Sequence, residues 1–146
     1  MLTGKKIVLG VSGGIAAYKM ANVASMLSKL HADIHVVMTE NATHFITPET
    51  FEVLTGNHCY TDTFDRCMEL HVPHIALGTQ AEAILIAPAS ADVVGKIANG
   101  IADDMLTTCV LPATCPVMLA PSMNVHMYEN PIVQDNLKTC LLYTSD

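Results

Sequence analysis

Two turns rich in serine, asparagine and proline follow short apolar runs in the second half of the chain. Pro88-Ala89-Ser90 comes after the run 83–87, and Pro121-Ser122-Met123-Asn124 comes after the run 117–120. Such wholly apolar runs are typical of strands buried on both faces of a parallel sheet. Because open α/β sheets bind ligands at the carboxyl ends of their strands, the two turns predict a small-molecule site.

A glycine-rich turn, Gly10-Val11-Ser12-Gly13-Gly14-Ile15, follows the apolar run 6–11 and precedes a helical pattern. Backbone N–H groups at such a helix start favour an anion such as phosphate. The spacing fits neither the dinucleotide fingerprint G-x-G-x-x-G nor the P-loop G-x-x-x-x-G-K-[ST]. The hydroxyls of Ser12, Thr39 and Ser90 each follow a predicted strand, and hydrogen bonds to a charged phosphate contribute about 1.5–3 kcal/mol each. They can hold a mononucleotide, or each can simply form a turn or a helix cap.

Three further residues have alternative interpretations. His74 is an acid/base group or a structural histidine at the start of an apolar run. Together with His71 it suggests a metal site. Against that site, Pro73 disfavours a single helix through both histidines, and no cysteine or acidic residue supplies further ligands at the usual spacing. Asn124, with Met127 packed near it, donates to a carboxylate or forms a turn or cap. Asp104 faces a ring system or caps a helix.

The apolar patterning predicts parallel strands alternating with helices. A helix opening at Gly13-Gly14 would turn Val23, Met26, Leu27 and Leu30 inward. Thr47 and Pro48 start another helix, which ends near Gly56, whereas 57–73 reads as irregular with a short edge strand. The expected strands are 6–11, 34–38, 83–87 and 117–120, and the later helices are 91–99, 104–111 and 131–138. We therefore expect one α/β domain over 1–146, a doubly wound, flavodoxin-like or Rossmann-like parallel sheet.

The composition narrows the function classes. A chain of 146 residues, 51% hydrophobic, can form a single core. The net charge of -7, without a lysine or arginine cluster, argues against nucleic acid and anionic membranes as partners. No apolar run is long enough to span a bilayer. Five cysteines without a C-x-x-C pair predict reduced thiols in a cytoplasmic protein with no metal site.

Six segments in order resemble the flavin-dependent cysteine decarboxylases, especially the branch that acts on phosphopantothenoylcysteine in coenzyme A biosynthesis. The resemblance runs from Gly4 to about Lys138. The segments are G-V-S-G-G-I-A-A from Gly10, M-T-E-x-A-x-x-F-I from Met38, His74-Ile75-x-Leu77, P-A-S-A from Pro88, G-I-A-D-D-x-L from Gly100, and P-x-M-N-x-x-M from Pro121.

The resemblance implies bound FMN at the interfaces of a homotrimer, or of a dodecamer built from trimers, and it implies residue roles. His74 would be the catalytic base, and Asn124 and Met127 would contact the small-molecule substrate. The implied cofactor contacts are Ser12, Gly13, Gly14, Thr39, Phe45, Pro88, Ala89, Ser90, Asp104 and Met105.

The chain departs from the family pattern in three places. Asp92 and Ser122 stand where asparagine and alanine are frequent, and nothing after Asn136 matches the cysteine-bearing, glycine-rich flap that covers the substrate. We expect a truncated piece, or final residues foreign to the family, with Cys140 outside any such flap. The alternatives are a decarboxylase of peptide C-terminal cysteines, a flavin prenyltransferase, and a non-catalytic flavin-binding regulatory protein.

Overall fold

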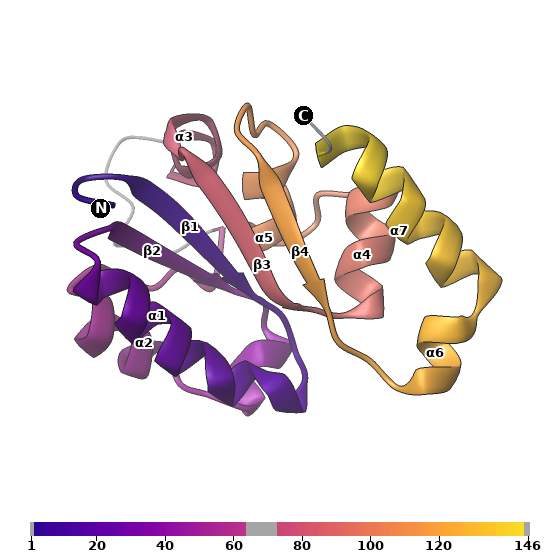
Figure 1. The fold of residues 1–146 in the computed structure, drawn as a ribbon, viewed down its shortest axis with the longest axis horizontal. Helices are drawn as coiled ribbons and strands as arrows, with labels where there is room; N and C mark the ends of the chain where they lie inside the picture. The colour runs from indigo at the N-terminus through magenta and orange to yellow at the C-terminus, as the bar shows by residue number, and fades with distance from the viewer. Residues whose placement is uncertain (1, 64–72, 145–146) are drawn as a thin grey trace.

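A four-stranded parallel sheet forms the centre of the protein (Figure 1). The computed structural model describes residues 2–63 and 73–144, with 73–76 and 142–144 described by their backbone alone. The strand order is β2-β1-β3-β4, so the chain moves outward from β1 in both directions. This confirms the predicted doubly wound α/β sheet. The strands are β1 (Lys6–Val11), β2 (Asp33–Met38), β3 (Ala83–Ala89) and β4 (Val117–Pro121).

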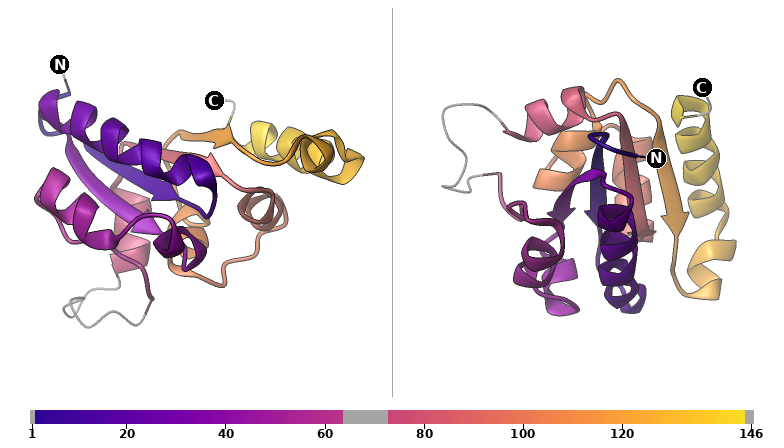
Figure 2. Two further views of the ribbon diagram at one scale, coloured as in Figure 1. Left: turned by 90° about the horizontal axis from the view of Figure 1, so that it is seen from below. Right: turned by 60° about the vertical axis from the view of Figure 1, so that its left-hand side comes forward.

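Helices lie on both sides of the sheet, as the views in Figure 2 show. Alternating strand residues therefore enter two cores: Leu9 and Val36 pack with α1 and α2, whereas Val8 and Ile86 pack with α3, α4, α5 and α7. The helical elements are η1 (Ile15–Lys19), α1 (Met20–Lys29), η2 (Asn41–His44), α2 (Pro48–Thr55), α3 (Pro73–Gln80), α4 (Ala91–Ala98), α5 (Met105–Val110), α6 (Val125–Glu129) and α7 (Pro131–Thr144).

Helix α2 begins and ends as expected, but its first residue is not capped as expected. Pro48 occupies the first turn, and Gly56 ends the helix with a φ of 75°, a backbone conformation that favours glycine. Thr47 is the N-cap, yet its side chain makes no hydrogen bond to the backbone. Its hydroxyl is 3.0 Å from the Thr50 hydroxyl instead. One of the two hydroxyls therefore donates to the other.

The helix after the glycine-rich turn differs from the prediction in its first turns and in its buried face. The chain forms the 3-10 helix η1 before α1 begins. The inward stripe contains Met20, Ala24 and Leu27, whereas Met26 is 59% exposed. Of the four residues expected to point inward, only Leu27 joins the core. Ala24 is the buried residue at the centre of this face, so a small side chain lies where the helix packs on the sheet.

Strand β4 contradicts the expectation that its apolar run is buried on both faces. Val117 is buried, but Met118 is 53% exposed and Ala120 is exposed as well. β4 lies at the edge of the sheet, and no helix among the described residues passes in front of it in Figure 1. The apolar run thus predicts the strand correctly. Whether the second face of β4 is buried depends on whether another element or another chain covers it.

Three short helical elements lie outside the predicted set: η2, α3 and α6. Pro73 opens α3, because a proline fits the first turn of a helix as well as it ends a preceding one; His71 lies outside the described residues. Within 57–63 the expected edge strand is a single parallel bridge between Tyr60 and Val37. None of the helices in the described part has the length and apolar character needed to cross a membrane.

Candidate functional site at the carboxyl edge of the sheet

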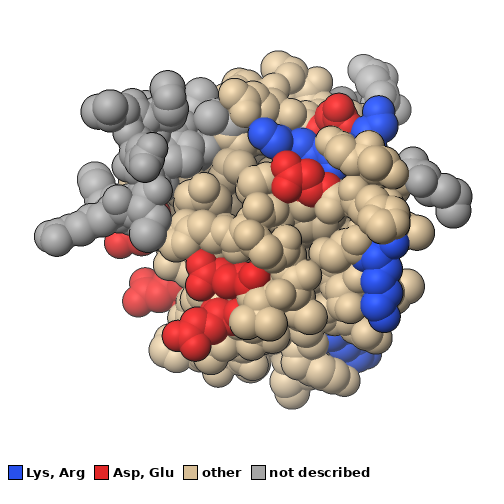
Figure 3. Space-filling view, turned by 90° about the vertical axis from the view of Figure 1, so that its left-hand side faces the viewer, with Lys and Arg blue, Asp and Glu red and all other residues tan. Residues whose placement is uncertain are grey.

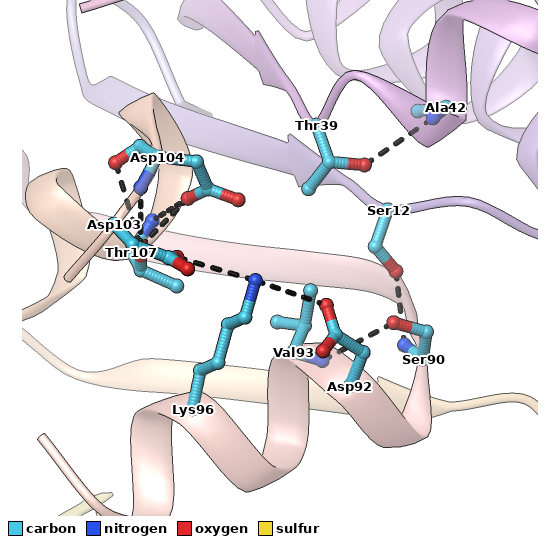
Figure 4. Close-up of polar contacts among 10 residues, drawn as sticks. All are labelled: Ser12, Thr39, Ala42, Ser90, Asp92, Val93, Lys96, Asp103, Asp104 and Thr107. Atoms are coloured by element: carbon cyan, nitrogen blue, oxygen red, sulfur yellow. Dashed lines mark hydrogen bonds and ion pairs between the residues drawn. The ribbon is translucent and has the colours of Figure 1, made fainter. Parts of the chain in front are cut away.

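The turns after β1, β2 and β3 are joined side by side at the carboxyl edge of the sheet (Figure 4). The Thr39 N–H donates to the carbonyl of Val11 at 3.0 Å, and the Ser12 N–H donates to the carbonyl of Pro88 at 3.3 Å. The three neighbouring strand ends therefore bring Ser12, Thr39 and Ser90 to one edge.

Ser12 holds two of these turns together through its side chain. Its hydroxyl is fully buried, donates to the carbonyl of Pro88, and accepts from the Ser90 N–H at 2.9 Å. The single hydroxyl proton is therefore already used inside the protein. Ser12 fixes the geometry of the edge, and a ligand oxygen would have to find its donors elsewhere.

Thr39 and Ser90 have hydroxyl protons that remain available. Thr39 Oγ1 accepts from the Ala42 N–H, and Ser90 Oγ accepts from the Val93 N–H, both at 3.2 Å. Within the residues that the structure describes, neither hydroxyl has an acceptor for its own proton. Each side chain thus orients its oxygen by capping a helical turn and can still donate to a ligand.

Gly13 and Gly14 differ in the space around them. A Cβ on Gly13 would lie 2.6 Å from the Cβ of Asn41, so the first residue of η2 occupies that space. Gly14 has an extended backbone, and a Cβ there would meet only Pro88 Cγ, at 4.0 Å. Gly13 is therefore required by the packing of η2 against the turn, and the surroundings of Gly14 are open.

The remaining residues of the β3 turn and of η2 have distinct positions. Pro88 and Ala89 are buried, and the Ala89 carbonyl accepts from the Ser122 N–H at 3.1 Å, which joins the ends of β3 and β4. The Ala87-Pro88 peptide bond is cis. Phe45 ends η2 and is about half exposed. Its ring is thus available beside the turn that carries Thr39.

Asp104 caps α5 through a reciprocal pair of hydrogen bonds. Its Oδ1 accepts from the Thr107 N–H at 2.8 Å, and Thr107 Oγ1 accepts from the Asp104 N–H at 3.2 Å. This capping box fixes the start of the helix. The next residue, Met105, has a side chain buried in the core. The cap expected for Asp104 is present, and the residue also lines a hollow.

That hollow has a volume of about 500 Å³ and an acidic wall. Acidic side chains also gather on the lower left of the face drawn in Figure 3, apart from the lysines at its right edge. A phosphate group in the hollow would be repelled, whereas an uncharged ring or hydroxyl groups would not. It is lined by Glu40, Thr43, Thr61, Asp62, Thr63, Asp103, Asp104 and Met105.

Asn124 stands at the start of α6, beyond the carboxyl end of β4 (Figure 1). Its Oδ1 accepts from the His126 N–H at 2.8 Å, so the side chain caps the helix. Across the described part of the chain, the amide nitrogen has no hydrogen-bond acceptor. Met127, one turn along α6, is 48% exposed. The cap fixes the amide so that its N–H groups can donate outward.

His74 lies in a different part of the fold. Its backbone is in the first turn of α3, and its side chain lies outside the described atoms. Helix α3 lies beside the amino ends of β1 and β3 (Figure 1), where the Glu82 N–H donates to the Lys6 carbonyl at 2.8 Å. A single chain therefore does not place α3 next to Ser12, Thr39 and Ser90.

Comparison with known proteins identifies the family. The Flavoprotein family model matches residues 1–141. The chain belongs to the flavoprotein family. Among curated proteins, it is 49% identical over 137 residues to the coenzyme A biosynthesis bifunctional protein CoaBC of Bacillus subtilis (strain 168). That match covers 94% of this chain and 34% of the relative, so the chain spans about a third of the relative's length.

Two solved structures of decarboxylases superpose on this flavoprotein over nearly its whole length. The FMN-dependent cysteine decarboxylase SpaF is 36% identical, with a TM-score of 0.89, covering 98% of this chain and 82% of SpaF. A PPC decarboxylase mutant complexed with pantothenoylaminoethenethiol is 29% identical, with a TM-score of 0.82, covering 97% and 79% of the two chains.

Cys109 and Cys140 of this flavoprotein are buried in the core, away from solvent. Burial, helped by the charge of Asp104, raises the pKa of Cys109 to about 12, and burial also raises the pKa of Cys140. Cys140 Sγ lies 3.7 Å from the carbonyl of Val94, where α7 packs on α4. Both thiols remain protonated at neutral pH and face the interior.

Lys96, near the hollow, is a residue that the sequence motifs do not single out. Lys96 Nζ lies 3.2 Å from a carboxylate oxygen of Asp92 and 3.2 Å from one of Asp103. The spacing of Asp92 and Lys96 on a predicted helix was a visible signal, since residues four apart share a helix face. The contact between Lys96 and Asp103 could not be predicted from the sequence, because it depends on the path of the chain after α4.

Proposed function

We propose that this flavoprotein domain binds FMN and decarboxylates phosphopantothenoylcysteine to phosphopantetheine in coenzyme A biosynthesis. The observation that carries the proposal is the 49% identity to a CoaBC protein over 94% of the chain. The structural likeness to a PPC decarboxylase adds support across 97% of the chain. The chain corresponds to only a third of CoaBC, so the proposal concerns the decarboxylation alone and no other activity of that bifunctional protein.

The carboxyl edge of the sheet fits FMN. The available protons of Thr39 and Ser90, together with the N-terminal N–H groups of α4, can hold a phosphate. The acidic hollow beside Met105 suits the uncharged parts of FMN. The carboxylates that line the hollow repel the phosphate of FMN, which therefore binds elsewhere on the edge. Ser12 contributes by holding the turns of β1 and β3 in register. This division of labour favours a mononucleotide over FAD, whose adenylate half has no matching fingerprint in the chain.

Bound FMN would supply a two-electron acceptor that oxidises the cysteine end of the substrate, so that CO2 can leave without forming an unstabilised carbanion, and would return the two electrons after CO2 has left, so that phosphopantetheine forms with no net oxidation. The protein then has two tasks. The outward N–H groups of Asn124 bind the substrate carboxylate, and the helix cap holds that amide in place. We assign His74 the part of the base that takes a proton from the substrate, a role for which imidazole is suited near neutral pH.

We further propose that the site forms between copies of the chain in a homotrimer. Helix α3, which carries His74, lies at the opposite edge of the sheet from Thr39 and Ser90, so a second copy has to supply one of the two groups. The exposed apolar Met118 on the open face of β4 supports such an assembly. Five cysteines without a C-x-x-C pair are typical of reduced thiols, which supports the cytoplasm as the compartment.

The likeness to SpaF keeps a second candidate, the decarboxylation of peptides that end in cysteine. The test is to incubate the FMN-loaded protein with phosphopantothenoylcysteine and, separately, with a peptide ending in cysteine, and to measure CO2 and product mass. We expect loss of CO2 from the first substrate alone. Loss from the peptide alone, or from neither substrate while FMN is bound, would overturn the proposal.

A further inference from the structure

Lys96 connects helix α4 to the segment that leads into α5. Its side chain extends from α4 between Asp92, on the same helix, and Asp103, on that segment (Figure 4). The lysine side chain is only 23% exposed, and its ammonium is 3.2 Å from both carboxylates. Of the two ion pairs, only the one with Asp103 joins different parts of the chain.

The backbone strengthens the same connection. The Ile101 N–H donates to the carbonyl of Lys96 at 2.9 Å, and Gly100, with a φ of 70°, lets the chain turn back toward the helix. Lys96 therefore contacts the segment twice, through its carbonyl near the beginning and through its ammonium near the end. These two contacts join an otherwise exposed segment to α4.

The held segment ends directly at the hollow. Asp103 lines it and is followed at once by Asp104 and Met105, which line it too. Asp104 begins α5 through its capping box with Thr107, so a shift of Asp103 would be passed to the first turn of that helix. The position of one lysine thus affects three residues of the hollow wall.

Charge favours the same arrangement. Burial by itself lowers the pKa of Lys96, but hydrogen bonds and attraction from Asp103 and Asp92 outweigh it, so the pKa is raised. The ammonium therefore stays protonated at neutral pH. It offsets part of the negative charge where Asp103 and Asp104 are adjacent.

We propose that Lys96 is a positioning residue for the cofactor, acting through Asp103 to keep Asp104 and Met105 in place at the hollow. The inference rests on the proposed binding of FMN and names a residue on which that binding depends. Since the hollow suits the uncharged part of FMN, Lys96 acts on the ring side of the site and not on the phosphate side.

The test measures dissociation constants for FMN and for riboflavin, which lacks the phosphate, by quenching of flavin fluorescence. Lys96→Met and Asp103→Asn should each weaken both flavins by about three- to tenfold, a range set by a partly exposed charged contact. The double variant should be no weaker than either single variant, because both remove the same contact. Lys96→Arg should retain most of the affinity.

Two matched variants separate positioning from general damage. Asp92→Asn removes the ion pair that stays within α4 and should leave the affinity for riboflavin unchanged; riboflavin is the readout for this variant, because Asp92 lies in the first turn of α4, on the phosphate side. Thr39→Val removes a donor on the phosphate side and should weaken FMN but not riboflavin. A merely structural role for Lys96 would lower the melting temperature of the flavin-free protein without changing either dissociation constant.

Parent-like affinity in both Lys96→Met and Asp103→Asn would overturn the inference and leave the proposed function standing. Equal losses in Asp92→Asn and Asp103→Asn would overturn it as well, since the effect would then not run through the segment. A parent protein that binds neither flavin would overturn the proposed function and this inference together.

Discussion

Asn124 shows at the scale of one residue how a capping side chain can also bind a ligand. Its oxygen is used by the His126 N–H at 2.8 Å, so the side chain is fixed at the start of α6. The amide nitrogen, which the cap does not use, is the group that we assign to the substrate carboxylate. The two interpretations that the sequence left open are therefore compatible, because they use different atoms of one amide.

Asn124→Asp tests this assignment without removing the cap, since aspartate is an equally good N-cap. The variant replaces the donor with a negative charge, and we expect binding of phosphopantothenoylcysteine to weaken by about 10²-fold from the lost charged hydrogen bond and the added repulsion. Titration calorimetry on the FMN-loaded protein measures it. Asn130→Asp is the matched control, because Asn130 caps α7 in the same way, with its Oδ1 accepting from the Ile132 N–H at 2.8 Å. Parent-like binding by Asn124→Asp would leave the residue with its cap alone.

At the scale of elements, the turn after β1 depends on how closely η2 approaches it. Gly13→Ala should lower the free energy of unfolding by about 1–3 kcal/mol, because its Cβ would lie 2.6 Å from that of Asn41 and overpacking costs energy of this order. Gly14→Ala is the control: its Cβ meets only one atom, at 4.0 Å, and its φ of 169° is open to any residue. Urea unfolding of the flavin-free proteins compares the two. Equal losses would show that glycine is needed for the turn itself and not for η2.

The elements also show what the sequence could predict. The strands were found because buried parallel strands are continuous apolar runs, and the ends of α2 because proline and glycine have strict backbone preferences. The inward face of α1 was misassigned, since the size of side chains that fits against a sheet depends on the sheet itself. Alanine at position 24 signals close packing only once the neighbouring strands are known.

In the candidate site, too, the features set by local sequence could be predicted, and those set by neighbouring elements could not. That Ser12, Thr39 and Ser90 share an edge could be predicted, because each follows a strand of a parallel sheet. That Ser12 uses its proton inside the protein could not, since it depends on where the Pro88 carbonyl lies. The link between Lys96 and Asp103 depends in the same way on the path of the chain after α4.

At the scale of the whole molecule, the open face of β3 and β4 is where we expect another copy to bind. Met118 pairs in register with Leu85 on this face and is 53% exposed. Met118→Glu should shift the protein from a trimer to smaller species in sedimentation experiments, because a charge would have to be buried at the interface. Val53→Glu is the control, since Val53 on α2 is 84% exposed and lies on the other half of the fold. An unchanged trimer in Met118→Glu would move the interface elsewhere.

Binding of FMN at the carboxyl edge of the sheet is the central requirement of the proposed function. Titration calorimetry of the purified, flavin-free protein with FMN, and separately with FAD, measures this directly. We expect one FMN per chain, bound more tightly than FAD, because the edge offers donors for one phosphate and the chain has no dinucleotide fingerprint. Tighter binding of FAD, or binding of neither flavin, would contradict the account.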